Sequence, residues 1–259
     1  MLHDFLSVFS GVLVGGVLGL IGGGGSILAV PLLVYLVGVP SAHVAIGTSA
    51  IAVAFSAFAS LIGHARMGHV RWRCAAVFTV AGIVGAAIGS TLGKAFDGKR
   101  LLLLFGLLMI VVAGMMLRSQ KGGTSKFKPL TRETFREIGA RLAGFGALTG
   151  TMSGFFGIGG GFLVVPGLIA ATDMSLISAI GSSLVSVTAF GLTTAANYAL
   201  SGFIDWRLVL LFVVGGIAGS FAGGRLAQRL SQHRTALKQI FAGVVASAGL
   251  YVVIRSFTG

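Results

Sequence analysis

The residues best suited to chemistry in this sequence are two glycine-rich runs inside apolar stretches, GGGGSILAVP at residues 22–31 and GIGGGFLVVP at residues 157–166. Each glycine lowers helix propensity by about 1 kcal/mol, so the backbone is expected to leave the helix at both runs. Amides freed in this way cannot face lipid and must be buried in protein or line a polar cavity. The apolar segments that follow, residues 26–38 and 162–172, would direct their helix starts at an anion. The residues that we expect to contact this anion are Gly22, Gly23, Gly24, Gly25, Ser26, Gly157, Gly159, Gly160 and Gly161.

Close helix packing is the alternative explanation for these glycines, because small residues let two helix backbones approach each other in a membrane. Packing favours spaced glycines rather than adjacent ones, so we assign the two runs to binding. We assign to packing the spaced glycines Gly82, Gly85, Gly89, Gly216, Gly219 and Gly223. A nucleotide-binding P-loop is excluded because neither run ends in Gly-Lys-Ser or Gly-Lys-Thr. Pro31 and Pro166 end the two runs and predict a kink in each following segment.

Hydroxyl groups recur at one position of each half, in the sequences IGTS at residues 46–49 and IGSS at residues 180–183. Their hydroxyls can donate hydrogen bonds to an anion or can bond back to a carbonyl one turn earlier, and both interpretations stay open. The candidates are Thr48, Ser49, Ser182 and Ser183. Asn197 is a carboxamide within an apolar stretch and is a further candidate for the same cavity.

The carboxylates and the cysteine content limit the chemistry. All six carboxylates fall in predicted loops or at segment ends, namely Asp4, Asp97, Glu133, Glu137, Asp173 and Asp205. A carboxylate that binds a driving cation or relays protons inside the membrane is therefore not expected. Cys74 is the only cysteine, which excludes an intramolecular disulfide and a cysteine metal cluster. We expect no metal site, no cofactor and no catalytic residue.

The elements that must position these groups belong to an internal repeat. The two glycine runs are 135 residues apart and share the skeleton GxGGxxLxVP, while IGTS and IGSS, like the two tryptophans Trp72 and Trp206, are 134 residues apart. Each half contains five apolar segments, at residues 5–21, 26–38, 42–65, 74–93 and 101–117 and at residues 142–156, 162–172, 176–201, 208–224 and 239–254. The second segment of each half is shorter than the about 20 residues that a crossing needs. We therefore expect half-helices, broken or re-entrant at the glycines.

Composition assigns this repeat to a bilayer. Of the 259 residues, 55% are hydrophobic and 10% are charged, and the mean hydropathy is +0.99. A water-soluble domain with these values would expose large apolar patches. The sequence predicts an all-α integral membrane protein with a membrane repeat at residues 1–117, a basic cytoplasmic linker at residues 118–141 and a second membrane repeat at residues 142–259. The net charge of +13 is typical of the orientation signal of such proteins, so a lipid bilayer is the expected partner and nucleic acid is not.

Basic residues also indicate how the halves are oriented. An odd number of crossings in each half inverts the second repeat and leaves 14 Lys and Arg residues on the linker side against 5 on the other side. An even number gives 12 against 7. The odd count follows the positive-inside rule better, so we expect inverted repeats with both termini on the side opposite the linker.

The duplicated glycine run, the IGTS and IGSS sequences and the Gly-x-Val/Ile-x-Trp pairs resemble those of the sulfite exporter TauE/SafE family of bacterial membrane transporters, over nearly the whole chain. The resemblance implies a transporter in the bacterial inner membrane that exports sulfite or an organosulfonate, and we expect alternating access around the glycine breaks. The two sites are expected to be unequal because Ser26 stands where the second run has Gly161. The sequence carries no signal for an oligomeric state.

Other functions are less favoured by the residues. A permease for another small anion is the nearest alternative. An intramembrane serine hydrolase would use Ser26 or Ser153 with a membrane histidine, but neither serine belongs to a Ser and His pattern that recurs in the repeat. A structural or assembly factor would need neither unwound glycines nor a polar cavity.

Overall fold

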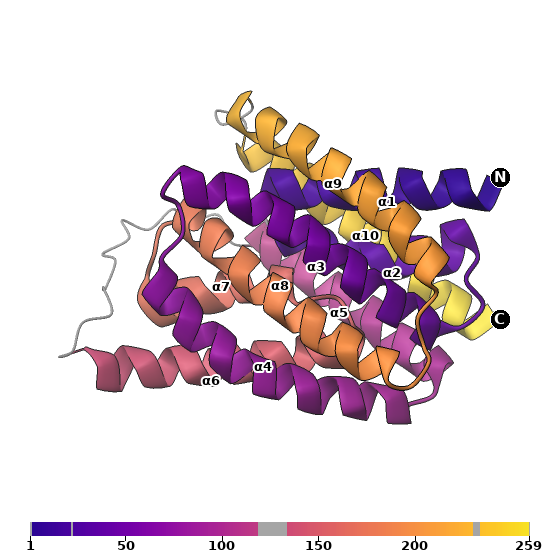
Figure 1. The fold of residues 1–259 in the computed structure, drawn as a ribbon, viewed down its shortest axis with the longest axis horizontal. Helices are drawn as coiled ribbons and strands as arrows, with labels where there is room; N and C mark the ends of the chain where they lie inside the picture. Colours follow the sequence, from indigo (N-terminus) through magenta and orange to yellow (C-terminus); the bar gives the residue numbers. More distant parts are fainter. Residues whose placement is uncertain (1, 22, 119–133, 230–233, 259) are drawn as a thin grey trace.

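The computed structural model describes residues 2–21, 23–118, 134–229 and 234–258, and every element within these ranges is helical (Figure 1). The first half contains α1 (Leu2–Ile21), the 3₁₀ segment η1 (Gly23–Leu28), the single turn α2 (Ala29–Pro31), the π-helical segment η2 (Leu32–Val37), α3 (Ala42–Arg66), α4 (Trp72–Ala95) and α5 (Gly98–Arg118). The second half contains α6 (Phe135–Phe156), α7 (Gly161–Thr172), α8 (Leu176–Ala199), α9 (Trp206–Arg229) and α10 (Arg234–Thr258). The predicted helical class is confirmed, and most of the basic linker lies outside the described residues.

Six helices in the described part of the chain are long and apolar enough to cross a membrane, namely α1, α3, α4, α5, α8 and α9. Shorter apolar helices cover Gly25–Val37, Gly161–Thr172 and Ala242–Ser256. The apolar windows of α3 and α8 are 72% and 56% buried, whereas those of the other four spans are 33% to 44% buried. Thus α3 and α8 form the centre of the bundle, and the outer helices expose apolar faces to lipid.

Contacts between the helices follow a two-fold pattern. α1 packs along α9 and α6 packs along α4, so the first helix of each half pairs with the fourth helix of the other half. Correspondingly, α3 contacts α8 and α9, and α8 contacts α3 and α4, while α5 packs against α10. α3 and α8 run antiparallel, because Gly47 packs against Tyr198 whereas Gly191 packs against Ala54.

Spaced glycines permit the closest helix pairs. A Cβ atom on Gly219 of α9 would lie 2.8 Å from the backbone nitrogen of Gly16 in α1, and one on Gly85 of α4 would lie 2.8 Å from that of Thr151 in α6. A side chain at these positions would push the helices apart. The prediction that this set of glycines serves packing is confirmed, and similarly close neighbours surround Gly82, Gly89, Gly216 and Gly223.

The start of α1 and the end of α10 lie at one end of the bundle, which we call the terminal end, and α6 begins at the opposite end (Figure 1). At the terminal end, Asp4 of α1 forms an ion pair with Arg207 at the start of α9. At the opposite end, Cys74 of α4 shares a buried apolar cluster with Ile138 of α6. α3 begins at the terminal end and α8 at the opposite end, as their antiparallel packing requires.

The second segment of the first half differs from the predicted half-helix. Instead of one helix over residues 26–38, the chain forms 3₁₀ turns, one α-helical turn and a π-helical segment. Pro31 lies where the α-helical turn meets the π-helix, and proline has no N–H to donate to an earlier carbonyl. Gly38, with a φ angle of 85°, ends the segment. In the second half a single short helix follows the glycine run, since α7 has 12 residues and contains Pro166.

Candidate functional site

The connection between α6 and α7 is built from glycines in the left-handed conformation. The φ angles of Gly157, Gly159 and Gly160 are 67°, 64° and 65°, which residues with a Cβ atom rarely adopt. α6 ends in a Schellman motif, in which the N–H of Ile158 donates to the carbonyl of Ser153 at 3.3 Å. The glycines therefore let the chain turn sharply out of α6 and into α7.

The start of α7 presents backbone donors beside Ser153. Gly160 is the N-cap residue of α7, and no side chain caps the helix. The amides of Gly161 and Phe162 begin the helix and have no acceptor within it. The Ser153 hydroxyl is fully buried and has no hydrogen-bond partner among the described residues. A Cβ atom on Gly160 would lie 2.8 Å from this hydroxyl oxygen, so hydroxyl and helix start meet at one buried point, an arrangement that suits an anion.

This point lies midway through the bundle. A Cβ atom on Gly159 would lie 3.1 Å from Cγ1 of Val53 in α3 and 3.2 Å from Cγ1 of Val187 in α8. Both valines lie near the middle of their helices. Residues 156–162 are all buried, so the glycine break is closed from solvent in this structure.

The glycine run of the first half is arranged differently. η1 contains three of its glycines, and Gly22 lies outside the described residues. A Cβ atom on Gly25 would lie 2.5 Å from the backbone nitrogen of Leu18, so this glycine lets η1 fold back onto α1. Ser26 is fully buried within η1. Because a short 3₁₀ segment does not align its amides as an α-helix does, the two glycine runs differ in backbone structure.

Thr48 and Ser182 hold the turn that joins two helices of the opposite half. Thr48 Oγ1 accepts a hydrogen bond from the N–H of Asp205, which precedes α9, at 3.1 Å. Ser182 Oγ accepts one from the N–H of Arg71, which precedes α4, at 2.9 Å. Both hydroxyls thus bind an amide at the start of a helix, where the helix itself provides no acceptor.

The glycine before each of these hydroxyl residues permits the contact. A Cβ atom on Gly47 would clash with the carbonyl oxygen of Phe203, and one on Gly181 would lie 2.9 Å from the carbonyl oxygen of His69. Phe203 and His69 belong to the two turns that Thr48 and Ser182 hold. The IGTS and IGSS sequences therefore form reciprocal clamps between the halves, which we call the loop clamps.

Ser49 and Ser183 bond back to their own helices. Ser49 Oγ donates to the carbonyl of Ile46 at 3.0 Å, and Ser183 Oγ donates to the carbonyl of Ile180 at 2.8 Å. Of the two interpretations left open by the sequence, the backbone bond is present at both positions.

Asn197 lies in a polar network between α4 and α8. Lys94 Nζ donates to Asn197 Oδ1 at 2.6 Å, to the Asn197 carbonyl at 3.0 Å and to Ser201 Oγ at 2.8 Å. The Asn197 amide donates in turn to Ser90 Oγ at 2.6 Å and to Thr91 Oγ1 at 2.9 Å. The network lies at the C-terminal ends of both helices, so it does not bring Asn197 to the glycine break.

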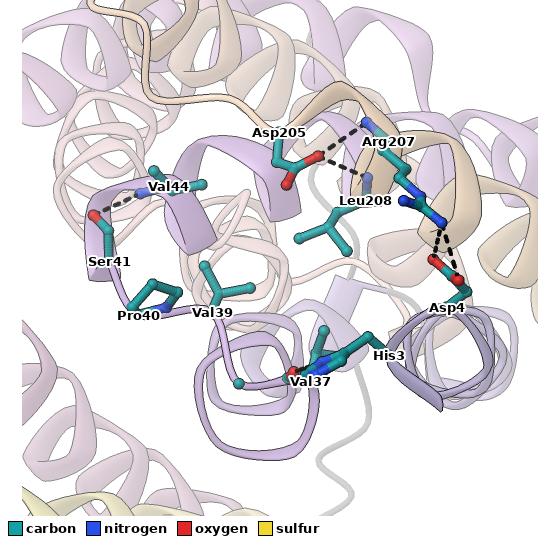
Figure 2. Close-up of a pocket in the computed structure, with 11 residues that line it drawn as sticks. His3, Asp4, Val37, Val39, Pro40, Ser41, Val44, Asp205, Arg207 and Leu208 are labelled. Carbon is teal, nitrogen blue, oxygen red and sulfur yellow. Dashed lines mark hydrogen bonds and ion pairs between the residues drawn. The ribbon is translucent and has the colours of Figure 1, made fainter. Parts of the chain in front are cut away.

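Two cavities open at the terminal end, and the larger has a volume of about 420 Å³ (Figure 2). On its wall, Asp4 pairs with Arg207 at 3.0 Å, and His3 Nδ1 lies 2.8 Å from the carbonyl oxygen of Val37. Asp205 caps α9 by accepting from two of its backbone N–H groups. The sequence sets Asp4 and Asp205 aside as carboxylates at segment ends and gives no sign of His3 or Arg207 as site residues, because only the fold brings these segment ends together.

The second cavity has a volume of about 360 Å³ and lies between the start of α3 and the start of α5. Its polar wall includes His43, Asp97 and Lys99. Pro40 and Ser41 line both cavities, so the turn between η2 and α3 separates them.

Comparison with known proteins identifies the family. The model of the sulfite exporter TauE/SafE family matches residues 7–252. The chain belongs to the TauE/SafE family. Its relatives include a probable membrane transporter protein of Xylella fastidiosa (strain Temecula1), 50% identical over 97% of this chain and 95% of that protein. They also include the probable membrane transporter proteins YunE of Bacillus subtilis, 26% identical over 87% of both chains, and MJ0441 of Methanocaldococcus jannaschii, 25% identical over 96% of this chain and 95% of that protein.

No solved structure matches the chain. Family membership and the apolar helices together make this TauE/SafE member a multi-pass membrane protein of a transporter family.

Proposed function

We propose that this TauE/SafE family member exports a small sulfur-containing anion, such as sulfite or an organosulfonate, and binds it at the start of α7. The observation that carries the proposal is the buried, unpartnered hydroxyl of Ser153 beside the N-cap Gly160. An oxyanion would accept hydrogen bonds from this hydroxyl and from the amides of Gly161 and Phe162, and it would be stabilised by the positive end of the α7 dipole.

The surroundings of the break favour a small anion over a zwitterion. The nearest side chains of the central helices, Val53 and Val187, are apolar and offer no negative charge. At the terminal end, Asp4 is engaged by Arg207, and Asp205 is engaged by the start of α9. An ammonium group such as that of taurine would be buried unpaired, at a cost of at least about 2 kcal/mol.

Transport would proceed by alternating access, with the two halves as inverted repeats around the central helices. The antiparallel packing of α3 and α8 and the reciprocal loop clamps support this part of the proposal. Further support comes from Trp72 and Trp206, which begin α4 and α9 at opposite ends of the bundle and are 57% and 64% exposed. Tryptophan is enriched at both membrane–water interfaces.

The charge distribution and the membrane potential support the proposed direction of transport. The opposite end of the bundle carries Arg66, Arg71 and Arg73 in and beside the turn between α3 and α4, so we assign it to the cytoplasm. An inside-negative membrane potential favours efflux of an anion by about 2.3 kcal/mol per charge per 100 mV. Export would therefore need no coupled ion.

The test is transport by the purified protein in liposomes under an imposed potential. Protein-dependent movement of sulfite or sulfoacetate should be faster toward the positive compartment, and taurine should move at least about tenfold more slowly. Protein-free liposomes provide the baseline. If sulfate, nitrate or another oxyanion is transported but sulfite and sulfoacetate are not, the protein is a permease for another small anion. The sulfite assignment is then wrong.

A further inference from the structure

The Tyr198 hydroxyl is a buried polar group that the proposed function does not use. The Tyr198 side chain is 0% exposed, and its hydroxyl oxygen has no hydrogen-bond partner among the described residues. Leaving a buried hydroxyl unpaired is unfavourable, and phenylalanine would fill the same volume without this penalty. A tyrosine at this position therefore suggests a ligand that pairs with the hydroxyl in another step of the protein's cycle.

His43 lies beside Tyr198 and also lines the second cavity. The two rings stack at a centroid distance of 6.4 Å, and the His43 ring also lies 5.4 Å from that of Phe203. His43 Nε2 is buried without a partner among the described residues, and His43 also lines the cavity of about 360 Å³. His43 therefore contacts Tyr198 and also reaches this cavity.

A fixed positive charge lies next to the pair. Lys94 Nζ is 6.0 Å from the centre of the Tyr198 ring. Its three hydrogen bonds go to Asn197 and Ser201, which are uncharged. The ammonium group is therefore held in position without a carboxylate among these partners, and its field favours a negative charge nearby.

Other charged groups line the same cavity as His43. Asp97 and Lys99 line the cavity, and Asp97 Oδ2 accepts from the N–H of Arg100 at 3.3 Å. The cavity therefore has one acidic and one basic side chain, whose charges oppose each other. Near Tyr198, by contrast, the positive charge of Lys94 favours an anion.

The pair lies between the glycine break and the cavity. Ile46 of α3 contacts Gly157 of the break, and a Cβ atom on the next residue, Gly47, would lie 3.0 Å from the Cβ atom of Tyr198. Two neighbouring residues of α3 therefore contact the glycine break and Tyr198, respectively.

The geometry points to a second oxyanion site, formed by the Tyr198 hydroxyl and His43 Nε2 under the charge of Lys94, on the route from the glycine break to the cavity. This inference rests on the proposed function, because its ligand is the anion that leaves the α7 site. The imidazole and phenol would each donate one hydrogen bond, with the His43 hydrogen on Nε2.

Calorimetric titration of the full chain in detergent tests this site. Sulfite, thiosulfate, sulfoacetate and sulfate would each be titrated into the wild-type protein and into the variants Tyr198→Phe and His43→Gln. We expect two classes of site in the wild type and an at least about tenfold weaker affinity of one class in each variant. Tyr251→Phe is the matched control, because Tyr251 is 51% exposed and lies on α10, and it should leave both classes unchanged.

The outcomes separate this site from the proposed function. If Tyr198→Phe and His43→Gln both give the wild-type isotherm, the second site is overturned while the α7 site stands. If Ser153→Ala gives the wild-type isotherm but the two variants weaken binding, the second site stands and the α7 site falls. If none of the four anions binds to the wild type, both proposals are overturned.

Discussion

Single hydroxyl groups in this protein have distinct tasks that residue type alone does not distinguish. Thr48 and Ser182 accept from amides of the opposite half, whereas Ser49 and Ser183, one position later, donate to their own helices. From the sequence, each of the four is a candidate anion ligand. Whether a hydroxyl bonds to the opposite half or to its own helix depends on which turn packs against that helix. This packing is a tertiary contact that the sequence does not show. From the sequence, Ser153 is a candidate only as a hydrolase nucleophile, because its position beside Gly160 depends on the turn between α6 and α7.

The loop clamps should act on stability. Thr48→Val and Ser182→Ala each leave one helix-start amide unpaired, so each should lower the free energy of unfolding by about 1–2 kcal/mol. The two clamps lie at opposite ends of the bundle, so the losses should add. Ser247→Ala is the control, since that exposed hydroxyl only bonds back to Gly243. Thermal unfolding in detergent measures the effect. Unchanged stability together with lost anion binding would instead make these hydroxyls solute ligands.

Ser153→Ala should separate binding from stability. Removing a buried hydroxyl without a partner should leave the melting temperature of the ligand-free protein unchanged or raise it, because an unpaired polar group is lost. Anion affinity should fall by about tenfold, because one hydrogen bond to a charged ligand is lost. Thr149→Val on the same helix is the control, since the Thr149 hydroxyl donates to Phe145 at 2.7 Å. A fall in melting temperature with unchanged affinity would make Ser153 a packing residue.

At the scale of elements, the glycine runs predict where the helices break but not what replaces them. Adjacent glycines remove helix propensity in both halves, and breaks occur at both. The second run forms a Schellman end and a new α-helix, whereas the first forms 3₁₀ turns followed by a π-helix. The difference arises from packing, since η1 folds tightly against α1 at Gly25, a contact between two backbones that no side-chain pattern encodes.

Leucine substitutions should distinguish the glycines of the break from those of helix packing. Gly159→Leu places a side chain at a φ angle of 64° and 3.1 Å from Val53, so transport per folded protein should be lost. Gly85→Leu should mainly reduce the yield of folded protein, because it separates α4 from α6. Gly114→Leu is the control, since nothing lies within 4 Å of its Cβ position. Normal transport by folded Gly159→Leu protein would refute the assignment of the break as the binding site.

At the scale of the whole molecule, the repeat and the helical class can be predicted from the sequence. Internal similarity and the length of apolar segments are both visible in the sequence without knowledge of tertiary contacts. The exchange of first helices between the halves does not follow, since α1 packs mainly on α9, more than 100 positions away in the sequence, and α6 packs mainly on α4 of the other half. The same exchange brings His3, Asp4 and Arg207 together at one cavity (Figure 2). Residues at segment ends have no periodic pattern, so their meeting could not be predicted.

The orientation of the second half is the property on which the inverted-repeat proposal depends. Arg225, near the end of α9, and Arg255, near the end of α10, are both exposed, and α9 and α10 end at opposite ends of the bundle. In a background where buried Cys74 is replaced by alanine, single cysteines Arg225→Cys and Arg255→Cys form a matched pair, because each removes one basic residue. A membrane-impermeant maleimide should label Arg255→Cys in intact cells and Arg225→Cys only after permeabilisation, since the positive-inside rule assigns the opposite end to the cytoplasm. The reverse pattern would place the terminal end in the cytoplasm and contradict the orientation assigned here. Together with a cytoplasmic linker, it would mean an even number of crossings in each half, and the glycine break could then not alternate between the two sides by the exchange of equivalent, inverted halves.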